Sequence, residues 1–76
     1  ENIDENLLKQ AMDTFYWIRD IKEVRKKPST SELIDWLNAL TLGGIDPETI
    51  RTKLPYLGVL IKKDEDIDIV KKRRVL

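Results

Sequence analysis

One helix with unusually clear ends dominates this sequence, and it lies within residues 29–44, which read STSELIDWLNALTLGG. Ser29 and Glu32 match the capping box, in which each side chain hydrogen bonds to the other residue's backbone N–H. Gly43 and Gly44 supply the left-handed conformation in which many helices end. The apolar residues between these ends recur at helical spacing and predict one buried stripe, formed by Leu33, Trp36, Leu37 and Leu40. A chain with such a segment must contain this helix and must bury its apolar stripe against other apolar residues.

Two segments on either side of the central helix carry helical patterns of their own. Asp4 is placed to cap a helix over residues 5–21, where apolar side chains recur at three- and four-residue steps. Asp46 followed by Pro47 is a helix-start pattern, and it predicts a short helix that reaches about Leu54. Neither segment shows the strict alternation of apolar and polar residues that is typical of a strand.

The last third of the chain predicts two more helices. Pro55 interrupts the chain, and residues 56–63 then form a largely apolar segment that fits a short helix. Asp64 is predicted to cap a final helix whose acidic residues come first and whose basic residues come last, an order that suits the helix dipole. Together the segments predict an all-α fold, a small bundle of four to five short helices in one domain over residues 1–76, with a frayed basic tail at 71–76.

The composition argues against several kinds of site. The chain has no cysteine and no histidine, so it lacks thiolate ligands, disulfides and the commonest general base. The acidic residues at 64, 65, 66 and 68 lack the glycine and the closing glutamate of a calcium loop, and they fit the start of a helix better. No nucleophile lies beside a base and no glycine-rich phosphate loop is present. We therefore expect no catalytic residue and no metal site in these residues.

Charge and hydropathy limit the partners. Lys and Arg number 14, and so do Asp and Glu, so the basic excess of a typical nucleic-acid-binding protein is missing. A helix-turn-helix is a less favoured alternative, because its recognition helix would carry only Arg51 and Lys53 as cations. No apolar run approaches the ~20 residues that cross a bilayer. The lack of cysteine fits a reducing compartment, so we expect a cytoplasmic protein without nucleic-acid or membrane partners.

The start of the central helix is the best candidate for binding a ligand. A helix N-terminus presents unpaired N–H groups and a partial positive charge, which suit an anion. Lys26 and Lys27 come directly before it, although the predicted capping box occupies some of those N–H groups. The residue types taken alone favour a packed helix over a phosphate site here.

Two motifs follow each other in this chain: residues 26–40 read KKPSTSELIDWLNAL, and residues 57–66 read LGVLIKKDED. In this order they resemble the C-terminal lid subdomain of the MoxR-type AAA+ ATPases, whose patterns are K-[KP]-P-S-x-[SA]-E-x-[LIT]-D-W-x-x-A-L and L-G-x-L-[LI]-K-x-x-x-D. The resemblance covers most of residues 19–70. It implies a small helical lid, and the acidic start without Met fits the expectation of a domain excised from a larger ATPase.

The resemblance implies a function for the parent protein rather than for these residues alone. In such ATPases the nucleotide lies between a P-loop subdomain and the lid, so ATP and Mg would be cofactors of the parent, and hydrolysis would take place outside this chain. The proteins are similar to ring-forming chaperones that remodel complexes or insert metals. The implied partners are the P-loop subdomain, neighbouring subunits of a homo-oligomeric ring and a von Willebrand factor A-domain protein.

Many lids of this kind place a sensor arginine at the start of one helix, and the corresponding residues here, 28–31, contain none. A lysine at 26 or 27 would have to replace it, or the backbone N–H groups would act alone, or the nucleotide would be sensed otherwise. From the resemblance we expect Lys27, Ser29 and Thr30 to lie beside the nucleotide.

An autonomous helical interaction domain is the main alternative to a lid. It would bind a peptide or a partner helix in an apolar groove, whereas a lid would leave bare an apolar patch larger than the few hundred Å² of a typical monomer. A DNA-binding domain would instead show a basic stripe. The lid hypothesis also predicts that the chain by itself hydrolyses no ATP.

Overall fold

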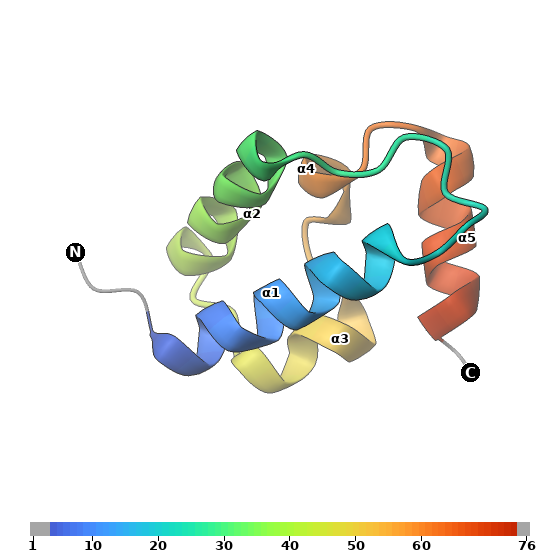
Figure 1. Ribbon diagram of the computed structural model, residues 1–76. Helices are drawn as coiled ribbons and strands as arrows, with labels where there is room; N and C mark the ends of the chain where they lie inside the picture. Colours follow the sequence, from blue (N-terminus) through green and yellow to red (C-terminus); the bar gives the residue numbers. More distant parts are fainter. Residues whose placement is uncertain (1–3, 75–76) are drawn as a thin grey trace.

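The structure, a computed structural model, describes residues 4–74, which form helices joined by irregular segments without a strand (Figure 1). The helices are α1 (Glu5–Arg19), α2 (Thr30–Leu42), the 3-10 helix η1 (Pro47–Thr49), α3 (Ile50–Lys53), α4 (Leu57–Leu60) and α5 (Asp64–Arg74). The predicted all-α fold, a small bundle of short helices, is therefore confirmed.

Both ends of α2 form as the sequence predicts. At its start the Ser29 hydroxyl accepts a hydrogen bond from the Glu32 N–H at 3.2 Å, and a Glu32 carboxylate oxygen accepts one from the Ser29 N–H at 2.9 Å. At its end Gly44 is left-handed, with a φ of 62°, and the Ile45 N–H donates to the Leu40 carbonyl at 3.1 Å. These bonds satisfy backbone groups that a helix terminus otherwise leaves unpaired, and so they fix the length of α2.

Alanine substitutions at two glycines should have opposite effects. Gly44→Ala puts a Cβ on a left-handed residue and should lower the free energy of unfolding by about 1 kcal/mol. Gly58 lies inside α4, where an added Cβ would meet open space. Gly58→Ala should therefore raise the free energy of unfolding by about 0.5 kcal/mol. Urea denaturation of both variants measures the difference, and equal losses in both would contradict the role given to Gly44.

The core forms where the apolar stripes of α1 and α2 meet the shorter helices. The α4 helix packs against α2, while η1 and α3 pack against α1 (Figure 1). All four residues of the stripe predicted for the central helix are buried, and Trp36 and Leu40 are fully so. Other large residues without exposed surface are Ile18, Ile50, Leu60 and Val70. Every helix except η1 therefore contributes to one common core.

The irregular segment of residues 20–29 links α1 to α2 and runs past the first turn of α5 (Figure 1). Three buried apolar residues anchor it to the core, namely Ile21, Val24 and Pro28. Its backbone is held by Asp66, a buried residue of α5, whose two carboxylate oxygens accept hydrogen bonds from the N–H groups of Arg25 at 2.9 Å and Lys26 at 3.0 Å. The segment is thereby fixed to α5 although it has no regular structure.

Two predicted helix boundaries are wrong by one or two residues. The first helix ends at Arg19 rather than at residue 21, because Ile21 lies beyond the helix and turns into the core. Asp64 is the first residue of α5 and not its cap, since the Lys63 carbonyl accepts the N–H groups of Asp66 and Ile67, each at 3.0 Å. Both corrections leave the number and order of helices unchanged.

The predicted fraying of the basic tail is wrong for residues 71–74, which form the last turns of α5. Arg73 forms an ion pair with Glu23, at 2.6 Å between Nη2 and Oε1, and Arg74 donates a hydrogen bond to the Thr52 carbonyl. These contacts tie the last turn to segment 20–29 and to α3. Residues 75 and 76 lie outside the described residues.

Candidate functional site

The three residues expected beside a nucleotide all lie at the start of α2, but their polar groups point to different partners. Lys27 directs its ammonium group back onto the preceding loop, where it donates to the carbonyls of Ile21 and, at 2.9 Å, Val24. Ser29 uses its hydroxyl and its N–H in the capping box. Thr30 is exposed in the first turn of the helix. Of the three, Thr30 alone leaves its side-chain hydroxyl to solvent, while Lys27 and Ser29 shape the helix start.

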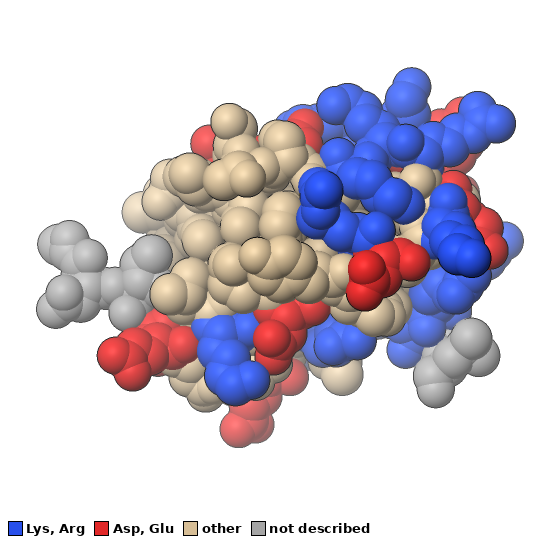
Figure 2. All heavy atoms as spheres, in the orientation of Figure 1, with Lys and Arg blue, Asp and Glu red and all other residues tan. Residues whose placement is uncertain are grey.

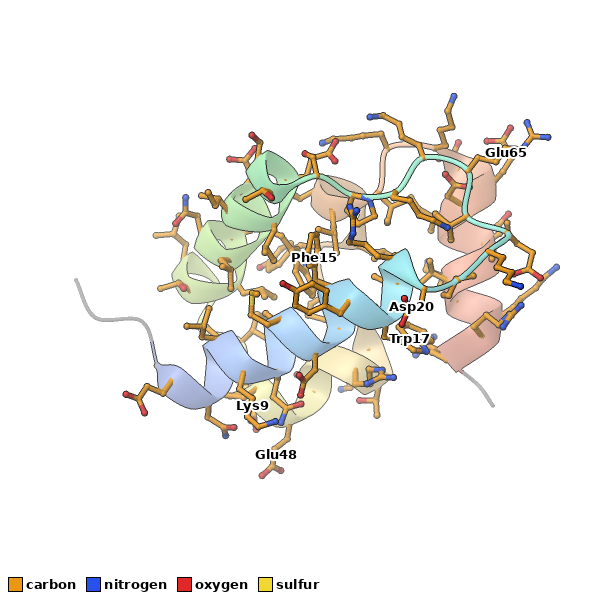
Figure 3. The ribbon with its side chains drawn as sticks, in the orientation of Figure 1. Lys9, Phe15, Trp17, Asp20, Glu48 and Glu65 are labelled. Atoms are coloured by element: carbon orange, nitrogen blue, oxygen red, sulfur yellow. The ribbon has the colours of Figure 1, made fainter. Side chains whose placement is uncertain are left out.

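Arg19 brings a cation to this helix start from the last turn of α1. Its guanidinium donates a hydrogen bond to the Pro28 carbonyl at 2.6 Å and lies over the Phe15 ring, 5.6 Å from the centroid. Figure 3 shows Phe15 between α1 and α2. The sequence did not predict this contact, because the loop between Arg19 and Pro28 has no regular pattern. The sequence indicated only that Arg19 is a basic residue near the end of a predicted helix.

The charges around the start of α2 are mixed. Arg19 and Lys26 supply positive charge, and the first N–H groups of the helix have no partner inside it. The Glu32 carboxylate adds negative charge at the same place. The hydrogen bond from the Ser29 N–H lowers the pKa of this carboxyl below its usual value. Lys26, whose Nζ lies 4.0 Å from the carboxylate, lowers it further. This end of α2 can therefore contact an anion, although one carboxylate already lies within it.

The acidic run at the start of α5 does not gather into one site. Asp66 is buried and bonded to backbone N–H groups, whereas Asp64, Glu65 and Asp68 are exposed. Within residues 4–74, no three side chains of His, Cys, Asp or Glu are grouped so that they could hold a metal ion. The run therefore supplies one internal hydrogen-bond acceptor and several charges on the surface.

In the view of Figure 2 an area free of charged side chains covers much of α2 and the adjoining edge of α1. Three large side chains of these two helices remain substantially exposed: Leu8 at 37% and Tyr16 at 56% on α1, and Ile34 at 53% on α2. We call these three residues the α1–α2 face. The Tyr16 ring packs edge-on against the buried Phe15, with 5.3 Å between centroids. Residues 36–45 carry no charge either, so α2 is uncharged over its C-terminal half.

No known protein family matches the chain, and neither the curated proteins nor the solved structures contain a match to it. None of the helices in residues 4–74 combines the length and the hydropathy that crossing a membrane requires.

Proposed function

We propose that this chain is the C-terminal lid subdomain of a MoxR-type AAA+ ATPase. The parent protein would bind ATP and Mg in a P-loop subdomain, assemble into a ring and act as a remodelling or metal-insertion chaperone, with a von Willebrand factor A-domain protein as a possible partner. The two motifs at residues 26–40 and 57–66 support this proposal, as does the helical bundle in which they occur.

The observation that carries the proposal is the α1–α2 face. Leu8, Tyr16 and Ile34 are each more than one third exposed, and they belong to α1 and α2, the helices along which Figure 2 shows an uncharged area. Large apolar side chains left exposed beside an uncharged area are suited to contact with another protein surface. In the proposed parent this partner is the P-loop subdomain of the same chain, and ATP binding would change how the two surfaces meet.

The start of α2 would then face the nucleotide. Arg19 and the exposed first turn at Thr30 are the groups that fit a phosphate, because a guanidinium and free helix N–H groups both donate to oxyanions. Lys27 and Ser29 would act indirectly, since their hydrogen bonds hold the loop and the helix start in place. ATP supplies the reactive phosphate, and the groups that activate water would belong to the P-loop subdomain.

The gene that encodes this chain provides the first test. We expect a G-x-x-x-x-G-K-[ST] motif to be encoded roughly 150–250 residues before Glu1, a separation typical of one domain. The full-length protein should hydrolyse ATP, and the 76-residue chain should not. A reading frame without such a motif would reject the proposal and favour an autonomous helical interaction domain. Steady ATP turnover by the 76 residues alone would also reject it.

A charge on the α1–α2 face should impair the full-length enzyme. We expect Ile34→Arg to lower kcat/KM for ATP by about tenfold, equivalent to roughly 1.4 kcal/mol of lost interdomain contact. Asn6→Arg is the matched control, because Asn6 is exposed on a different side of α1 from Leu8. Thermal unfolding of the separate chain checks that Ile34→Arg leaves the bundle folded. Equal activity of the two variants would show that the face makes no functional contact.

A further inference from the structure

A cavity of about 420 Å³ lies at the C-terminal part of α1, and it is lined by Trp17, Arg51, Arg73 and Arg74. These residues come from three elements, α1, α3 and the last turn of α5. Figure 3 shows Trp17 where the end of α1 approaches α3 and the last turn of α5. The volume falls within the range of about 300–1,000 Å³ that is usual for small-ligand sites. The cavity therefore has room for a small molecule and is lined mainly by cations.

The positive charge of this cavity is only partly compensated. Arg73 pairs with Glu23, but both side chains are about half exposed, so the pair is weak and can exchange partners. Neither Arg51 nor Arg74 forms an ion pair with another residue in the 4–74 range. Arg74 donates one hydrogen bond to a carbonyl, and a guanidinium has five N–H donors, so most of its donors stay available. Two unpaired guanidinium groups thus border one cavity in a chain whose net charge is zero.

Packing alone explains only part of this arrangement. Basic residues in the last turn of a helix interact favourably with its dipole, which accounts for Arg73 and Arg74. Arg51 belongs to another helix, and its guanidinium lies over the Trp17 ring, 4.5 Å from the centroid. That stacking orients the group, so a ligand would meet an arginine that has already lost much of its rotamer freedom.

We propose that this cavity binds a phosphoryl dianion, either inorganic phosphate or the terminal phosphate of a small molecule. A dianion matches the two guanidinium groups that lack an ion-pair partner. Its three terminal oxygens can accept paired hydrogen bonds from more than one arginine, and it carries two negative charges where a carboxylate carries one. The site is independent of the proposed lid function, because it lies at the junction of α1, α3 and α5 rather than at the start of α2.

Titration of the chain with inorganic phosphate, glycerol phosphate and pyrophosphate tests the proposal, with chloride used to hold the ionic strength constant. The readout is the indole N–H signal of Trp17 in ¹H–¹⁵N NMR spectra, and the fully buried Trp36 serves as the internal reference. We expect saturable movement of the Trp17 signal alone. A response to phosphate but not to glycerol phosphate would assign the site to the free ion, and the reverse would assign it to esters.

Arg51→Gln should weaken phosphate binding by at least about tenfold, because it removes one charge-assisted bidentate partner. Lys53→Gln is the matched control: Lys53 is an exposed cation on the same helix that does not line the cavity, and its loss should change the affinity less than twofold. Arg73→Gln, at an exposed position, supplies a second variant if Arg51→Gln disturbs the fold. Equal weakening by Lys53→Gln, an equal response to acetate, or no saturable response would overturn the proposal.

Discussion

Replacing Asp66 with alanine is expected to lower the free energy of unfolding by about 3 kcal/mol. The substitution removes the acceptor for the N–H groups of Arg25 and Lys26, which the buried carboxylate binds at 2.9 and 3.0 Å. A hydrogen bond to a charged group contributes about 1.5–3 kcal/mol, and because these two bonds are only part-buried we take the lower end for each. A domain of 76 residues has a total free energy of unfolding of roughly 4–11 kcal/mol, so this loss is a large fraction of it.

Thermal unfolding followed by circular dichroism measures the effect, which should shift the midpoint by roughly 15 °C. Asp68→Ala is the matched control, since Asp68 is exposed on the same helix, and it should change the free energy of unfolding by less than about 0.5 kcal/mol. If the two variants lose the same stability, Asp66 acts only as a charge near the start of α5, and its hydrogen bonds to the loop contribute nothing.

The hydrogen bonds between Asp66 and the loop should also make the stability of the protein depend on pH. Burial by itself raises the pKa of Asp66, but the hydrogen bonds from the Arg25 and Lys26 N–H groups, with the nearby charge of Lys63, hold it below its ordinary value. A carboxyl whose pKa is lower in the folded state stabilises the protein above its unfolded pKa of about 4, and this stabilisation is lost as the pH falls through the folded pKa. Asp66→Asn should therefore show a smaller loss of stability than the wild type as the pH falls below about 4.

Replacing Trp36 with alanine is expected to cost about 4 kcal/mol, the largest single effect in this domain. Trp36 has no exposed surface, so its removal leaves a cavity at the centre of the core. Its indole N–H also donates to the Pro55 carbonyl at 2.8 Å. That bond holds a turn in which Leu54 and Tyr56 are both left-handed, with φ of 47° and 56°, a conformation that costs each residue roughly 1 kcal/mol.

Trp36→Phe separates the hydrogen bond from the packing. It keeps most of the ring volume but leaves the Pro55 carbonyl without its donor, and it should lower the free energy of unfolding by about 2 kcal/mol. Urea denaturation of both variants gives the two values, and Tyr16→Phe, which keeps an exposed ring, controls for aromatic substitution. A Trp36→Phe variant as stable as the wild type would show that the turn holds its shape without the indole.

Local patterns determined the helices. Ser29, Glu32 and Gly44 act through backbone groups within four residues of themselves, so the boundaries of α2 could be predicted without any knowledge of the rest of the fold. The buried stripe of α2 followed from helical spacing alone. The start of α5 was misplaced by one residue because Lys63, which gives no capping pattern, supplies the first carbonyl.

The contacts that join distant segments were decided by tertiary structure. Asp66 bonds to Arg25 and Lys26, which lie 41 and 40 residues away in the sequence. Arg19 bonds to Pro28 across an irregular loop. Neither contact produces a repeating pattern of residues from which it could be predicted. The same applies to the cavity at Trp17, whose arginines come from different helices. The sequence by itself determined where each helix begins and ends to within a few residues, because those choices depend on neighbouring backbone groups. Packing in three dimensions decided which charged groups contact each other, because those contacts depend on how the loops place one helix beside another.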